Sequence, residues 1–186
     1  MDDIFLPPDS QRRLLSLSRQ TLNDFVRGIE RQAETIDDPN LQTRDYGAFV
    51  SLHKNQELRG CIGNCASKDP LYRTVIEMTR AAASRDTRMA PVSEDELDDI
   101  RIDITVLSPL VRVYDPLSLE VGKHGLQVSQ GGRRSVLLPQ VAAQYRWDMR
   151  TFLEQTCVKA GLRKNAWRDV DSEVSTFTAL IMEEQR

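Results

Sequence analysis

The sequence predicts a fold that combines α-helices with antiparallel β-hairpins. Two pairs of strand-type segments, each joined by a short turn, predict the hairpins: residues 46–52 with 58–63, and residues 125–129 with 133–138. Apolar residues that recur at helical spacing predict helices before, between and after the hairpins. The length of 186 residues suits one domain, or one domain with a small lobe, and allows a sizeable core.

Helix signals stand at two places in the first half of the chain. Asp9 or Ser10 can cap a first helix whose apolar positions continue to about Ala33. Asp69 as N-cap, with Pro70 at the first helical position, begins a second helix. The first helix is predicted to be a packing element, and the start signal of the second is strong.

The second half of the chain predicts further strands and helices. Residues 100–107 alternate between apolar and polar, which is typical of a half-buried strand, and residues 173–182 predict one final strand. Asp148 begins a helix that ends at Gly161 and places Cys157 on its apolar side. We therefore expect Cys157 in the core.

Composition and charge narrow the class of protein. The 25 basic and 28 acidic residues are mixed along the chain and leave a net charge of −3, so no global basic field would attract nucleic acid or anionic lipid. The first eight residues are acidic and lack the basic region of a signal peptide. No apolar run reaches the roughly 18 residues of a membrane span. We expect a cytoplasmic protein without a membrane partner, and the charge argues against nucleic acid.

The segment Leu58–Gly63 carries the residues most suggestive of chemistry. In a regular strand Arg59, Cys61 and Gly63 share one face, with same-face neighbours about 6.5–7 Å apart. A nearby positive charge lowers the pKa of a cysteine, and the thiolate is the nucleophile. Gly60 and Gly63 would allow a ligand or another backbone to approach closely. The alternative is that Cys61 is a small buried hydrophobe and that the glycines mark a bulge or tight packing.

The cysteines do not predict a disulfide framework or a metal site. Their number is odd, and without an export signal reduced thiols are expected. Cys61 and Cys65 are separated by three residues, which is a weak metal or redox signal. The cluster-binding pattern of radical enzymes needs a further cysteine where Lys68 stands.

A polar stretch after the second helix contains three further candidates for substrate binding. Residues 84–89 place Arg85 and Arg88 around Asp86. The alternative for this stretch is a solvated connection between elements.

Two candidates lie in the second half of the chain. Glycines on either side of Lys123 and His124 suggest a tight turn, and His124 is preferred for proton transfer because His53 lies beside a hairpin turn. The alternative for His124 is a solvated turn histidine. Gln140 follows Pro139 at a helix start, where unpaired amides can bind an anion.

The motifs together resemble the AMMECR domain family, the first component of the AmmeMemoRadiSam system. The matching segments occur in family order from about Gly47 to Glu183 and comprise residues 58–63, 82–88, 104–109, 122–126, 131–134, 137–142 and 157–162, followed by Trp167. The chain departs from the family at Cys65, where no cysteine is required, and at Met89, where members often have Phe.

The resemblance implies an α+β fold with a mixed or antiparallel sheet and packed helices. It implies a larger and a smaller lobe that form a cleft near Leu58–Gly63. It also implies a single AMMECR-type domain over residues 1–186, with a core at about 9–184 and residues 1–8 as an N-terminal extension. Memo-like and radical-SAM proteins are the implied partners, whereas no reaction and no cofactor are implied.

Two functions remain open. The leading hypothesis is a cysteine-dependent enzyme or enzyme component that acts on a small or modified substrate with an anionic or carbonyl group. In it Cys61 is the nucleophile or tether, Arg59 and Arg88 are charge partners, His124 is the acid or base, and Gln140 is a polar anchor. The competing hypothesis is a non-catalytic module that docks the Memo-like or radical-SAM partner. RNA or nucleotide binding is weaker, because the charge is acidic.

Overall fold

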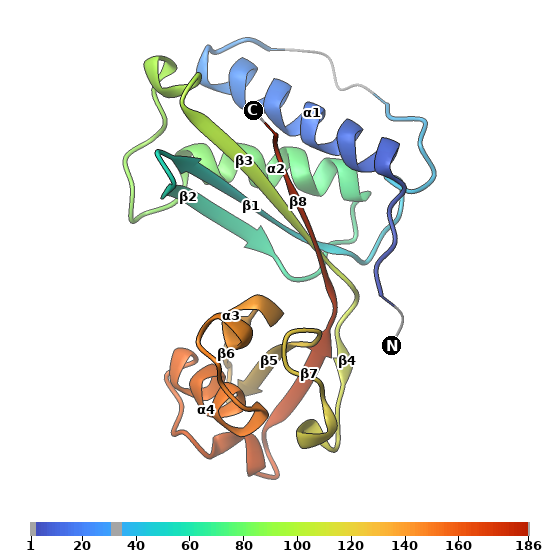
Figure 1. Cartoon of the computed structure of the whole chain (residues 1–186), viewed down its shortest axis with the longest axis vertical. Helices are drawn as coiled ribbons and strands as arrows, with labels where there is room; N and C mark the ends of the chain where they lie inside the picture. Colours follow the sequence, from blue (N-terminus) through green and yellow to red (C-terminus); the bar gives the residue numbers. More distant parts are fainter. Residues whose placement is uncertain (1–2, 31–34, 186) are drawn as a thin grey trace. The chain divides into compact units, whose positions relative to one another are not determined.

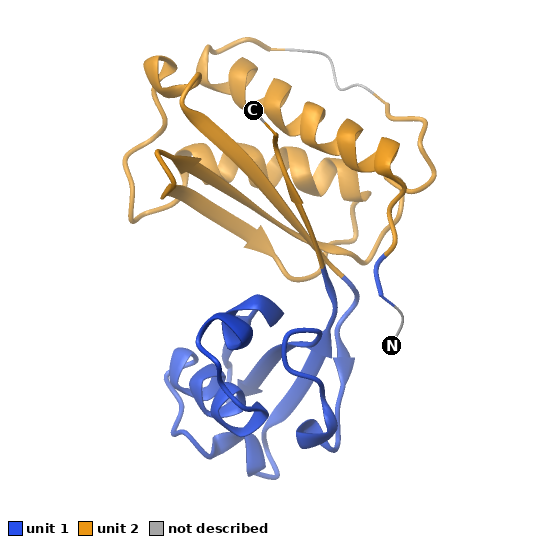
Figure 2. Ribbon diagram, in the orientation of Figure 1, with its two compact units in different colours: residues 1–4, 108–179 blue, residues 5–107, 180–186 orange. Residues whose placement is uncertain are grey.

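The computed structural model describes residues 3–30 and 35–185 and shows an α+β fold (Figure 1). The chain forms two compact units: unit 1 comprises Met1–Ile4 and Ser108–Ala179, and unit 2 comprises Phe5–Leu107 and Leu180–Arg186 (Figure 2). Each unit contains one four-stranded sheet and packed helices. The predicted fold class is therefore confirmed, whereas the single-domain boundaries and the cleft stay predictions.

The sheet of unit 2 has the strand order β2-β1-β3-β8. Its strands are β1 Gly47–Lys54, β2 Glu57–Asn64, β3 Ile100–Leu107 and β8 Ala179–Glu183. The first hairpin turns at Asn55 and Gln56, whose φ angles of 52° and 68° are both positive, as a two-residue type I′ turn requires. The predicted hairpin is confirmed, and β2 lies at the edge of its sheet.

Two helices pack in unit 2, namely α1 Pro8–Val26 and α2 Leu71–Ser84. Helix α2 packs against β1 and β2, and α1 packs against α2 and β3. Prolines rather than Asp9 or Asp69 start both helices: Pro7 and Pro70 are the N-cap residues. Across the residues that the structure describes, no helix is both long enough and apolar enough to span a membrane.

Helix α1 ends earlier than its apolar spacing predicts. Gly28 has a φ of 67°, and its N–H donates to the carbonyl of Phe25 at 3.2 Å while the N–H of Ile29 donates to that of Asp24 at 2.8 Å. These two bonds form a Schellman cap, which a left-handed glycine favours. The predicted continuation through residues 31–34 lies outside the described residues.

Strand β2 contains a β-bulge that its alternating pattern does not reveal. Leu52 pairs with Gly60, but the next residue, His53, pairs with Leu58. Arg59 is therefore the extra residue, and a bulge of this kind interrupts regular alternation. Regular alternation would place Leu58 on the same face as Gly60, but the bulge moves Leu58 to the face of Cys61.

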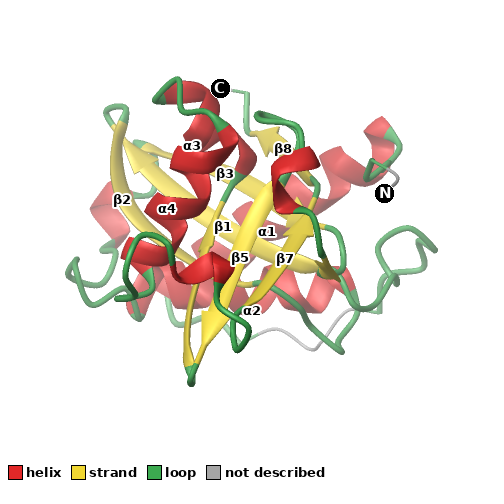
Figure 3. Cartoon of the chain, turned by 90° about the horizontal axis from the view of Figure 1, so that it is seen from below, coloured by secondary structure: helices red, strands yellow, loops and turns green. Residues whose placement is uncertain are grey.

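Unit 1 is built on a sheet of order β4-β7-β5-β6. Its strands are β4 Val111–Arg112, β5 Gly125–Gln130, β6 Arg133–Leu137 and β7 Glu173–Phe177, and its helices are α3 Pro139–Gln144 and α4 Met149–Lys159. Unit 1 also contains the short 3-10 helices η2 Pro116–Ser118 and η3 Ala166–Arg168, whereas η1 Glu94–Glu96 lies in unit 2. Asp148 caps α4 by accepting the N–H of Thr151 at 2.7 Å. Helix α4 packs against β5 and β6; Figure 3 shows the helices and strands of the chain in different colours. Cys157 of α4 is fully buried in the hydrophobic core, as predicted.

The predicted final strand is divided between the two sheets. Strand β7 belongs to the sheet of unit 1 and β8 to the sheet of unit 2, with Thr178 between them. The N–H of Thr178 donates to Ser108 Oγ, and the N–H of Ser108 donates to the carbonyl of Thr178, both at 3.0 Å. Both residues are buried. The two hydrogen bonds therefore satisfy backbone groups where the chain leaves one sheet for the other.

We expect Gly60→Ala to destabilise the protein by about 3 kcal/mol, at the upper end of typical overpacking. A Cβ at this position would lie 2.4 Å from the carbonyl oxygen of Ala82, and a backbone group of α2 cannot move aside alone. Gly131→Ala is the control: its surroundings are open and its φ is 55°, so only about 1 kcal/mol of left-handed strain is expected. Urea unfolding measures both, and equal losses would contradict the close approach of β2 to α2.

Candidate functional site

The candidate site lies on the face of the unit 2 sheet opposite the buried side chains of β1. Direct strand partners share a face, and alternate residues of a strand do so as well. We call this surface the Cys61 face. Its three rows across β2, β1 and β3 are Gly63, Phe49 and Thr105; Cys61, Ser51 and Asp103; and Leu58, His53 and Arg101. The alternate side chains Val50 and Leu52 are fully buried on the other side, whereas Cys61 and Ser51 are half-buried.

Three side chains hold Cys61 in place. Ser51 Oγ donates to Cys61 Sγ at 3.1 Å. The Cys61 N–H donates to Asp86 Oδ2 at 2.9 Å, and an Arg88 amino group donates to the Cys61 carbonyl at 3.4 Å. Because β2 is an edge strand, the N–H and the carbonyl of Cys61 have no further strand to bond with, and Asp86 and Arg88 satisfy them instead. The thiol is thus fixed both at its sulfur and at its backbone.

Asp86 and Arg88 form a bidentate pair beside Cys61. Arg88 Nε donates to Asp86 Oδ1 at 2.9 Å, and an Arg88 amino group donates to Oδ2 at 2.7 Å. The hydrogen bond from Arg88, followed by that from the Cys61 N–H, holds the pKa of Asp86 well below its usual range. Arg85 does not join this group, because its side chain is exposed and its ion-pair partner is Glu77 at 3.9 Å.

Arg59 points to a different segment. Its Nε donates to Glu96 Oε1 at 2.9 Å and an amino group donates to Oε2 at 2.7 Å, while Ala90 and Pro91 accept from it through their carbonyls. Glu96 also accepts from Lys54 Nζ at 3.1 Å. The Arg59 guanidinium holds the pKa of Glu96 well below its usual range. Arg59 therefore anchors β2 to residues 90–96.

The two glycines of the segment have a packing explanation. Gly60 is needed where β2 approaches the Ala82 carbonyl, and a Cβ at Gly63 would lie 2.2 Å from the ring of Phe49. Their predicted role in substrate binding stays a prediction.

Sequence reasoning passed over His53 and Asp103, which the structure brings together. His53 Nε2 lies 3.1 Å from Asp103 Oδ2, and the side chains are only 23% and 16% exposed. Asp103 Oδ1 is buried and has no hydrogen-bond partner within the described residues, although Arg101 Nε lies 3.6 Å from it. Burial raises the pKa of Asp103, against the opposing effects of His53 and Arg101. Alternation along β1 places His53 on the same face as Ser51, but no residue near Asp103 in the sequence indicates that His53 is its partner.

His124 and Gln140 belong to unit 1, whereas the other predicted site residues belong to unit 2. His124 Nδ1 accepts the N–H of Glu120 at 3.0 Å in the turn before β5, and Gly122 in that turn has a φ of 86°. Gln140 is half-buried in the first turn of α3. Their convergence with Cys61 stays a prediction.

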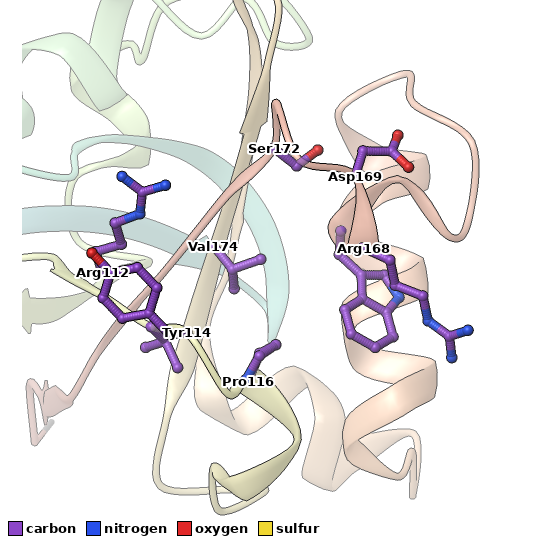
Figure 4. Close-up of a pocket in the computed structure, with 9 residues that line it drawn as sticks. Arg112, Tyr114, Pro116, Arg168, Asp169, Ser172 and Val174 are labelled. Atoms are coloured by element: carbon purple, nitrogen blue, oxygen red, sulfur yellow. The ribbon is translucent and has the colours of Figure 1, made fainter.

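Unit 1 also contains an open hollow of about 250 Å³ that no predicted site residue lines (Figure 4). The guanidinium of Arg112 lies 5.3 Å from the centre of the Tyr114 ring, and that of Arg168 lies 4.7 Å from the Trp167 ring. Tyr114 is 86% exposed. The lining offers stacking surfaces and charge but no thiol or imidazole, so we do not place the chemistry here.

None of the three cysteines, all of which lie in the described residues, is in a disulfide; Cys61 and Cys65 are half-buried and Cys157 is buried. Burial raises the pKa of the Cys157 thiol. In residues 3–30 and 35–185, no three His, Cys, Asp or Glu side chains gather as metal ligands would.

We expect Asp86→Asn to destabilise the protein at neutral pH by about 1.5–3 kcal/mol, because it removes a hydrogen-bonded charge. The folded-state pKa of Asp86 is depressed below the ordinary aspartate value of 3.8, so its stabilisation is present above that value and is lost as the pH falls below it. The difference between wild type and variant should therefore shrink between about pH 5 and pH 2. Urea unfolding across this range checks it, and a constant difference would contradict the ion pair.

Known proteins match this chain over most of its length. The AMMECR1 family model matches residues 15–182. A protein from Methanothermobacter thermautotrophicus is 37% identical over 96% of both chains, and one from Methanosarcina barkeri is 42% identical over 94% of this chain and 90% of its own. The crystal structure of an uncharacterised protein from Pyrococcus horikoshii superposes with a TM-score of 0.83 at 33% identity, covering 93% of this chain and 90% of that one. The chain therefore belongs to the AMMECR1 family.

Proposed function

We propose that the protein is a cysteine-dependent enzyme, or a component of one, in which Cys61 is the nucleophile or covalent tether. The observation that carries this proposal is the hydrogen bond from Ser51 Oγ to Cys61 Sγ at 3.1 Å, on a half-buried sheet face. A hydroxyl that donates to sulfur stabilises the thiolate, which is the reactive form. A thiol that served only as apolar filling would have no need of this donor.

The neighbouring charges favour a small substrate with a carbonyl or anionic group. Arg88 is the better charge partner for it, since its side chain is 58% exposed and it already reaches the Cys61 carbonyl. A cation so placed can stabilise negative charge that develops on a substrate oxygen. Arg59 is engaged by Glu96 and two carbonyls, so we assign it to holding β2 rather than to the substrate.

His124 and Gln140 remain candidates for the acid or base and for the anchor. Their assignment rests on the sequence pattern alone, because they belong to unit 1.

A non-catalytic docking module is the second candidate. One observation favours it: Arg59, Asp86 and Arg88 make their polar contacts with groups of the protein itself. Such contacts give the edge strand one fixed shape, which an interface for a Memo-like or radical-SAM protein would require. In this case Cys61→Ser would leave partner capture unchanged, whereas a covalent tether would be lost with the thiol.

We expect iodoacetamide to alkylate Cys61 at pH 7 at least about a hundredfold faster than Cys157. Cys61 is half-buried with a hydroxyl donor, while Cys157 is fully buried and inert thiols are those buried in apolar surroundings. Peptide mapping by mass spectrometry gives both rates in one sample, with Cys65 as an internal half-buried reference.

Equal slowness of Cys61 and Cys157 would remove the nucleophile and leave the docking module. If Cys61 is fast, cell extract passed over the wild type and over Cys61→Ala identifies any small molecule that depends on the thiol. Cys61→Ser separates a covalent attachment from binding by shape.

A further inference from the structure

We propose that His53 is the proton acceptor for the Cys61 thiol and that Asp103 is the residue that positions its imidazole. This inference rests on the proposed function of Cys61 and adds the group that generates its thiolate. It also replaces His124, which the sequence favours, with the other histidine of the chain.

The strand register brings the two residues together. Cys61 lies directly opposite Ser51, and His53 is two positions from Ser51 on the same strand. His53 and Cys61 are therefore diagonal neighbours on one face, with Cα atoms about 7–8 Å apart, a separation that aromatic side chains can bridge. The register of β1 with β3 is regular through Ser51 and His53, so the bulge in β2 does not turn His53 to the opposite face.

Asp103 determines which nitrogen of His53 is available. The 3.1 Å contact joins Nε2 to Asp103 Oδ2, so the Nε2 hydrogen is directed at the carboxylate and Nδ1 is left as the acceptor. Within the described residues no hydrogen bond to Nδ1 is found. The structure shows no hydrogen bond between the Cys61 thiol and His53 within the described residues, so the proton would pass to Nδ1 through one water.

Negative charges lie on the Asp103 side of the pair. Asp103 carries its negative charge on a largely buried side chain whose Oδ1 lacks a hydrogen-bond partner in the described part of the chain. Arg101 lies near Oδ1, and Glu183 and Glu184 from the C-terminal strand and its end add negative potential. A positive charge on His53 would compensate these groups, because a buried charge is stabilised chiefly by an opposite one.

The charges on the side of Cys61 do not oppose this transfer. Arg88 donates to the Cys61 carbonyl, and a cation beside the thiol favours the thiolate, although the bidentate pairing with Asp86 offsets part of its charge. In the transfer the S–H bond breaks and its electron pair remains on sulfur. The proton forms a new N–H bond at Nδ1, so the product is a thiolate and an imidazolium with no change in total charge. Ser51 Oγ donates to the sulfur and stabilises the thiolate.

The test measures the rate at which iodoacetamide alkylates Cys61 at pH 7. We expect His53→Ala to slow it by about a hundredfold, the low end of what a positioned proton acceptor contributes. Added imidazole should restore most of the alkylation rate in this variant and should leave the rate of the wild type unchanged. Loss of packing alone would not be repaired by imidazole, so the rescue separates proton transfer from structure.

Asp103 is tested separately, because it is proposed to act on Cys61 only by positioning His53. Asp103→Asn should slow alkylation, while Asp103→Glu should recover part of the rate, since a carboxylate is again available to the imidazole. His53→Gln serves as a second variant if His53→Ala fails to fold, and thermal unfolding monitors both. His124→Ala is measured beside them.

The outcomes separate this inference from the proposed function. Fast alkylation of Cys61 in both wild type and His53→Ala would overturn the inference and leave Cys61 as the nucleophile. A slow rate that appears in His124→Ala but not in His53→Ala would assign the proton transfer to His124 instead. An unreactive Cys61 in the wild type would overturn both proposals.

Discussion

The segment that contains Cys61 depends on one buried carboxylate. Asp86 is 6% exposed and accepts hydrogen bonds from both the Cys61 N–H and the Arg88 guanidinium. A carboxylate removed from water is costly unless charged donors surround it, and Asp86 has them. In return, the edge strand β2 obtains a partner for an outward backbone group that would otherwise face solvent. Removing Asp86 would release strand, arginine and cysteine together.

A second pair and one close contact complete the support of β2. Arg59 joins the strand to Glu96, and Gly60 lets it lie against the Ala82 carbonyl. These contacts act on three sides of the strand: its outer edge, its bulge and its helix face. Much of the cationic character that the sequence displays near Cys61 is therefore used in contacts within the protein, and Arg88 has the more exposed of the two guanidinium groups.

The Cys61 face draws one residue of its central row from each of three strands. Ser51 comes from the middle strand, Cys61 from the edge, and Asp103 from the strand on the other side. The row is thus assembled from positions up to 52 residues apart in the chain, Ser51 to Asp103. Strands are stiff and their neighbours are closely spaced, so a sheet is well suited to holding such groups at fixed separations.

The sequence by itself determined the local elements, because turns, caps and periodicity depend on residues only a few positions apart. Both hairpins, the Asp148 cap and the burial of Cys157 follow from such patterns, and so does the identification of Asp86 and Arg88 as notable. Only the tertiary structure decided the bulge at Arg59, which changes the partner of Ser51 from Gly60 to Cys61 relative to a regular two-residue hairpin. It also decided the pairing of His53 with Asp103 and the division of residues 173–182 between two sheets. The physical reason is that sheet membership and register depend on hydrogen bonds to distant segments, which local propensity does not encode.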